Sequence, residues 1–230
     1  MKRTWILTIL LAVPLVGQEH NHSSMADGAM DMHEMHSSAH MHMTELRAEQ
    51  PGDRKRADDV AAAANSVMAK YSDYKVAEAD GFEPFLPKLK QKMVHFTNYD
   101  NAMEAAVRFN PEHPTSLLYE PVEGGYRLIG VMYTAPYFFT EAQLNDRIPL
   151  SVAQWHVHTN LCISPDGQRW KMLLPNSKFG LNGSISTEKA CTDAGGTFRD
   201  HVLGWMVHVY PNEQDASQIW SVERQMGDMH

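Results

Sequence analysis

The segment Gln154-Trp155-His156-Val157-His158 contains two histidines separated by one residue, in a stretch whose residue types favour a β-strand. Successive strand side chains point to opposite faces, so His156 and His158 share one face while Trp155 and Val157 share the other. Two imidazoles about 6 to 7 Å apart on one strand can bind a single ion, because each bond from zinc or copper to an imidazole nitrogen is about 2 Å long. The spacing therefore predicts a transition-metal site on this strand.

Two further segments repeat this arrangement. In Gly204 to Tyr210, an apolar face of tryptophan and valine lies opposite Met206, His208 and Tyr210, and in Val94 to Thr97 a single histidine, His95, stands between apolar neighbours. If the three strands belong to one sheet, its polar face carries the four predicted metal ligands, which are His156, His158, His208 and His95. The alternative is a set of structural histidines, bonded to carbonyl groups, in an interaction domain of the cell envelope.

Candidates for proton transfer are few. Glu120 ends an otherwise apolar strand segment and is a candidate ligand, partner of a histidine N–H, or general base on a metal-bound water. Tyr210 is the second catalytic candidate, on the same predicted face as His208. His113 and His201 are predicted to be loop histidines outside the site.

The stretch from Gln18 to Met43 is rich in histidine and methionine, with small and polar residues in the gaps. No apolar face forms, so a disordered tail is expected, continuing as a linker to residue 55. Imidazole binds several transition metals, whereas thioether sulfur favours Cu(I). Copper is therefore the favoured ion, with zinc or iron as alternatives. The tail contains His20, His22, His33, His36, His40 and His42 and Met25, Met30, Met32, Met35, Met41 and Met43.

The N-terminus has the pattern of a secretory signal, predicted over residues 1–17. Lys2 and Arg3 precede an apolar run from Trp5 to Val16, which at about 12 residues is too short for a membrane span of roughly 20. The mature chain is therefore expected in the periplasm or outside the cell, with no integral membrane segment. Its formal net charge of −8 argues against nucleic-acid binding. Metal ions are the expected partners, and the oligomeric state is not indicated.

Cys162 and Cys191 are the two cysteines of the chain. In an oxidising compartment an isolated pair is expected to form a disulfide. The alternative is that Cys162, which closely follows the histidine motif, is a thiolate ligand.

The remaining segments predict a single α+β domain over residues 56–230. A helix is expected from Ala57 to Tyr71, a hairpin from strands at Ser116 to Glu120 and Tyr126 to Tyr133, and a second hairpin from Gly167 into Arg169 to Leu174. Neighbouring strands joined by short turns imply a mainly antiparallel sheet, either open or barrel-like, with a few short helices.

Two resemblances accompany these patterns. The tail resembles the Met/His-rich stretches of exported copper-handling proteins. The folded part is similar to an uncharacterised family of exported bacterial proteins around Trp155 to Cys162, Cys191 to Gly196 and Gly204 to Val209. That likeness implies one domain and a Cys162–Cys191 pair, with no activity attached. The cupin pattern does not fit, because Thr159 to Cys162 stand where its glutamate is expected.

These observations lead to two hypotheses. The first is an exported transition-metal-binding protein, with copper favoured, that serves metal homeostasis or tolerance. The second is a metal-dependent enzyme in which three histidines leave an open coordination position for water, dioxygen or substrate. Whether the protein is an enzyme is left open at this point.

Overall fold

The computed structural model describes residues 39–88, 90–174, 176–214 and 216–221. The predicted signal peptide and most of the Met/His-rich tail lie outside these residues. In chain order the elements are β1 (Met41–Met43), α2 (Asp53–Lys70), α3 (Tyr74–Ala79), β2 (Glu83–Pro84), β3 (Val94–Thr97), α4 (Tyr99–Val107), β4 (Ser116–Val122), β5 (Gly125–Ala135), α5 (Glu141–Arg147), β6 (His156–Ile163), the 3₁₀ helix η1 (Arg169–Leu173), α6 (Glu188–Asp193), β7 (Thr197–Val209) and α7 (Ala216–Ile219).

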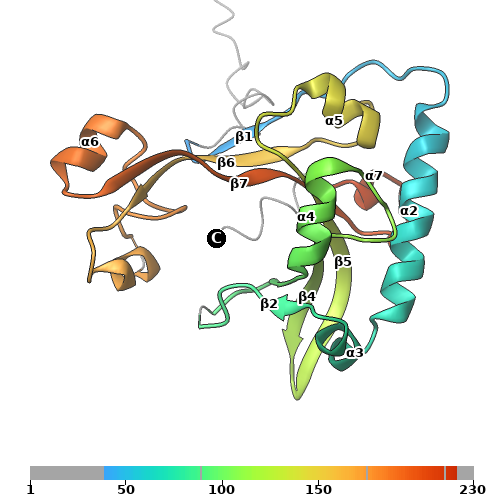
Figure 1. Ribbon diagram of the computed structural model, residues 1–230, viewed down its shortest axis with the longest axis horizontal. Coiled ribbons are helices and arrows are strands. Elements are labelled where there is room, and N and C mark those ends of the chain that lie inside the picture. The colour runs from blue at the N-terminus through green and yellow to red at the C-terminus, as the bar shows by residue number, and fades with distance from the viewer. Residues whose placement is uncertain (1–38, 89, 175, 215, 222–230) are drawn as a thin grey trace, which may run out of the picture.

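All seven strands form one antiparallel sheet in the order β1-β6-β7-β5-β4-β3-β2 (Figure 1). The sheet has β1 at one edge and β2 at the other, and it does not close into a barrel. Helices accompany it, so the α+β prediction is confirmed. The β4–β5 hairpin lies where the sequence predicted it.

The main core lies between the helices and one face of the sheet. α2 buries Ala57, Val60, Ala64 and Met68 at helical spacing, and these residues pack with the buried aromatic and aliphatic side chains of the strands. Trp155, which is fully buried, belongs to this core. Successive residues of a strand point to opposite faces, so the strand residues that lie between these core residues point to the other face of the sheet.

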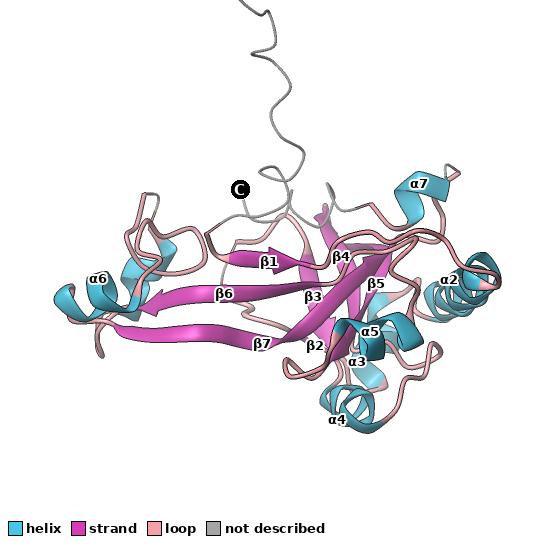
Figure 2. Ribbon diagram, turned by 90° about the horizontal axis from the view of Figure 1, so that it is seen from above, coloured by secondary structure: helices cyan, strands magenta, loops and turns pink. Residues whose placement is uncertain are grey.

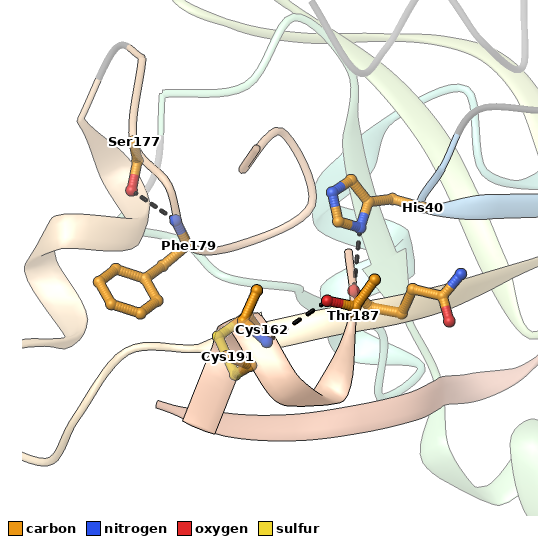
Figure 3. Close-up of a disulfide and its surroundings, with 8 residues drawn as sticks. His40, Cys162, Ser177, Phe179, Thr187 and Cys191 are labelled. Carbon is orange, nitrogen blue, oxygen red and sulfur yellow. Dashed lines mark hydrogen bonds between the residues drawn. A yellow bond between two sulfur atoms is a disulfide. The ribbon is translucent and has the colours of Figure 1, made fainter. Parts of the chain in front are cut away.

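β6 and the first half of β7 form a two-stranded arm that extends from the rest of the sheet and ends near α6 (Figures 1 and 2). The Cys162–Cys191 disulfide, with a Cα–Cα distance of 5.5 Å, joins β6 to α6 (Figure 3). Both sulfur atoms lie in a small buried cluster with Phe179. The predicted disulfide is present, so Cys162 is not a free thiolate.

Four expectations differ from the structure. Residues 41–43, expected within a disordered tail, form β1 against β6, and α2 begins at Asp53 instead of Ala57. The alternation Met-His-Met fits a strand, but its context of small polar residues masked this. Arg169 to Leu173 forms a 3₁₀ helix, η1, instead of a hairpin strand. His201 lies in β7 instead of a loop, because β7 extends further toward its N-terminal end than predicted.

Candidate metal centre

β6 and β7 place three of the predicted ligands on the sheet face opposite the main core. Trp155 and Val157 pack in that core, as do the alternate residues of β7. His156 and His208 therefore point to the other side, where they are only 2% and 3% exposed. The predicted alternation of the two strands is confirmed.

His95 reaches the same face from β3, although β5 and β4 lie between β3 and β7. Strand pairing relates His95 to Leu118 and Leu118 to Gly130, and it relates Met132 to His208, so all of these residues share one face. Gly130 has no side chain to fill the middle of this face. A Cβ there would lie 2.8 Å from Cδ1 of the Tyr210 ring, so the glycine makes room for Tyr210.

The four imidazole rings form a continuous row in the order His95, His208, His156, His158. The ring centroids are 5.4 Å apart for the first pair, 5.3 Å for the second and 5.6 Å for the third. The Nε2 atoms of His95 and His208 are 3.5 Å apart. This is long for an N–H···N hydrogen bond.

Burial favours the neutral form of three of these imidazoles. It lowers the pKa of His95 to about 4, although part of that side chain stays exposed, and nearby His158 contributes to the shift. Burial also lowers the pKa of His208 well below its ordinary value and lowers the pKa of His158. A neutral imidazole is the form that coordinates a metal ion.

The Nδ1 atoms of His208 and His158 have different surroundings. Nδ1 of His208 lies 3.3 Å from the Tyr210 hydroxyl, which leaves Nε2 directed at His95. Nδ1 of His158 is buried and, like Nε1 of Trp155 in the main core, makes no hydrogen bond of normal geometry within the described structure, although the nearby His40 backbone raises the pKa of His158 against the larger lowering by burial. Buried ring nitrogens are normally paired, so an unpaired one beside three further imidazoles fits an electron-pair donor to an ion.

The spacing of the first pair also fits one ion. With metal–nitrogen bonds of about 2.05 Å, two nitrogens 3.5 Å apart subtend about 117°, close to the tetrahedral angle. Within the described residues, however, no three histidine, cysteine, aspartate or glutamate side chains already stand at metal-binding distance of one point. A third imidazole ligand would require rotation of the His156 ring toward the first pair.

The remaining candidates lie elsewhere. Glu120 forms an ion pair with Arg127, its cross-strand neighbour near the turn of the β4–β5 hairpin, and its side chain is 35% exposed. His113 pairs with Glu104 in a turn, as expected of a loop histidine. His201 stacks on Tyr137 with ring centroids 3.8 Å apart. No described contact brings any of the three to the row of imidazoles.

His40, a tail residue, has a structural position. Its Nε2 donates to the Gly183 carbonyl at 2.6 Å, and its Nδ1 lies 3.1 Å from the Asn160 carbonyl. Figure 3 shows the ring directed at the loop before α6. The other histidines of the tail, apart from His42, lie outside the described residues.

Sequence reasoning overlooked how many methionines share the face with the histidines. They come from β1, β5, β7 and the residue preceding β3, and they are Met41, Met43, Met93, Met132 and Met206. The Met-His-Met alternation at residues 41–43 carried the signal for two of them.

The chain matches no protein-family model, no curated protein and no solved structure. Among the described helices, none is both long and apolar enough to cross a membrane.

Proposed function

We propose that this chain is an exported transition-metal-binding protein, with copper as the favoured ion, that serves metal homeostasis or tolerance. His95, His208 and His156 are the proposed ligands, and His158 is a fourth donor at the end of the row. The observation that carries the proposal is the 3.5 Å separation between the Nε2 atoms of His95 and His208, both in neutral rings whose pKa values are lowered.

Two features support binding over hydrogen bonding alone. Nδ1 of His158, at the end of the row, is buried and makes no hydrogen bond of normal geometry within the described structure, so this nitrogen is available to an ion. Burial also lowers the pKa values of His95 and His208, so both imidazoles are in the neutral form that binds a metal ion. The disulfide and the signal-like N-terminus support a place outside the reducing cytoplasm.

The enzyme hypothesis has less support. A catalytic metal needs a coordination position open to substrate, whereas His156 and His208 are almost completely buried. Glu120 is paired with Arg127 away from the rings. Tyr210 is the remaining candidate for proton transfer, and it is itself buried.

A metal titration tests the proposal, provided the tail does not mask the result. We define the tail-substituted chain as the full-length protein in which the four histidines of residues 18–38 are changed to asparagine and the four methionines of the same residues are changed to leucine. The changed residues are His20, His22, His33, His36, Met25, Met30, Met32 and Met35. Zn(II), Cu(II) and, with a chelator in competition under anaerobic conditions, Cu(I) are titrated separately.

One ion should bind tightly to this chain. His95→Ala, His156→Ala and His208→Ala should each weaken binding at least tenfold, about 1.4 kcal/mol. His201→Ala is the matched control, because it removes a strand histidine stacked on Tyr137 and should leave affinity unchanged. If all three variants keep wild-type affinity, or if the parent chain shows no tight binding, the metal centre is wrong and the four histidines are structural.

A further inference from the structure

Methionines are the cross-strand neighbours of the histidines on β6 and β7. Met41 of β1 is paired with His158, and Met43 is paired with His156. On the other side of His156, the partner in β7 is Met206. Directly opposed residues in an antiparallel pair have Cβ atoms about 4.5 to 5.5 Å apart, on the same face. His156 therefore stands between two thioether side chains.

The side of the sheet that Met41 and Met43 occupy is independently established. His42, between them, contacts the Trp205 ring at a centroid distance of 5.6 Å, and Trp205 belongs to the main core. The methionines on either side of His42 therefore point to the opposite face, where they are buried.

The distribution of methionine between the two faces is uneven. Among the described residues of the main core, Met68 is the one methionine, and valine, alanine and aromatic side chains provide the packing. In the described part of the chain, the histidine-bearing face has five buried methionines. Apolar packing alone favours no such division, since leucine or valine would fill the same positions.

Cysteine thiolates are not available as sulfur ligands. Both cysteines of the chain are joined in the disulfide at the end of the β6–β7 arm. Soft ligands at the imidazole row can therefore only be thioethers. Thioether and imidazole together favour Cu(I), whereas Zn(II) is bound by imidazole, carboxylate and thiolate and gains little from a thioether.

We infer that Met43 and Met206, with Met41 beside them, are sulfur ligands of the proposed centre and make it selective for Cu(I). This inference rests on the proposed function. It assigns β1, the last part of the Met/His-rich segment, to the centre itself: the segment contributes two sulfur donors by adding an edge strand to β6.

The test compares two ions in the tail-substituted chain. Met41→Leu with Met43→Leu, and separately Met206→Leu, keep side-chain volume while removing sulfur. Each variant should lose at least tenfold in Cu(I) affinity, measured against a competing chelator, while Zn(II) affinity stays within threefold of the parent. X-ray absorption of the Cu(I)-loaded parent should show sulfur in the first coordination shell, reduced in the variants.

Met68→Leu is the matched control, because Met68 is a buried methionine on the other side of the sheet. It should change neither affinity, and circular dichroism should show that every variant is folded. If the parent binds Zn(II) and Cu(I) but the methionine variants keep Cu(I) affinity, or no sulfur is detected, the sulfur assignment is wrong and the histidine centre stands. If the variants lose both ions equally, β1 acts through structure and the selectivity proposal fails. If the parent binds neither ion, the histidine centre and this inference both fail.

Discussion

The Tyr210 hydroxyl lies 3.3 Å from Nδ1 of His208, and both side chains are buried. The opposite nitrogen of the same ring, Nε2, is directed at His95. A hydrogen bond at one nitrogen selects the tautomer and orients the ring for a ligand at the other.

Tyr210→Phe should therefore weaken metal binding by about tenfold, and it should lower the free energy of unfolding by about 1 kcal/mol. Titration and urea unfolding measure the two effects. Tyr133→Phe is the control, since Tyr133 is also buried and donates to the Pro111 carbonyl at 2.6 Å, on the core side of the sheet and outside the row of four imidazoles. Tyr133→Phe should lose stability and keep metal affinity. If both variants lose metal affinity equally, Tyr210 has no specific role in the metal centre.

The metal-free protein should lose stability as the pH falls from about 6.5 toward 4. His95, His158 and His208 have pKa values below the ordinary 6.5 in the folded chain. Between the two values the unfolded chain binds protons that the folded chain does not, so the stabilisation is complete above 6.5 and declines as the pH drops. Urea unfolding at a series of pH values checks this. His95→Gln should reduce the dependence on pH, and a flat profile in the wild type would contradict the burial argument.

Asp53 predicts a second acid dependence, at lower pH. Hydrogen bonds from Arg56, from the Gln50 amide and from the Ser151 hydroxyl lower the pKa of its carboxyl to about 2. The stabilisation is present above the ordinary value of 3.8 and disappears as the pH falls toward 2. Asp53→Asn should thus be less stable than the wild type at pH 7, with a difference that narrows below pH 4. Asp58→Asn, an exposed change on the same helix, should be neutral at both pH values.

How far sequence reasoning succeeded depends on which interactions decided each element. The alternation of apolar and polar residues predicted the two faces of β6 and β7 correctly. The reason is that Trp155 and Val157 are stabilised by burial in the main core, which fixes the side of the sheet to which each residue points. β1 was not predicted, because a three-residue strand is stable only through its pairing with β6, far away in the sequence. The proximity of His95 to His208 depends on the strand order and on the space at Gly130, and neither can be read from local patterns.

Gly130 is the position where this close packing is tested most directly. A Cβ would lie 2.6 Å from the Val209 carbonyl oxygen and 2.8 Å from the Tyr210 ring. Gly130→Ala should cost about 1 to 3 kcal/mol of stability, and it should weaken metal binding by displacing Tyr210 from His208. Unfolding and titration of the same preparation measure both. A fully stable variant would mean that β5 and β7 are less closely packed than described.

Loss of the disulfide should affect stability and spare the metal centre. Cys162→Ser with Cys191→Ser opens a bridge that spans 29 residues, which the chain-entropy model values at about 3 to 4 kcal/mol. The bridge joins β6 to α6 at the end of the arm, beyond His158. Metal affinity at low temperature should stay within threefold of the parent, and a larger loss would show that the arm and the imidazole row are coupled.

The position of β1 at the edge of the sheet also has a consequence for the order of folding. The Gln154 amide donates to the Thr44 carbonyl across 110 residues, whereas β4 and β5 are joined by a tight turn. Closing so long a loop is costly in entropy until β6 has a partner in β7, so the hairpin should form early and β1 late. Nascent chains would acquire the imidazole row together with Met206 first, and Met41 and Met43 of β1 last. A partly folded intermediate would therefore lack two of the three proposed sulfur ligands, and its preference for Cu(I) would rise when β1 adds to the sheet.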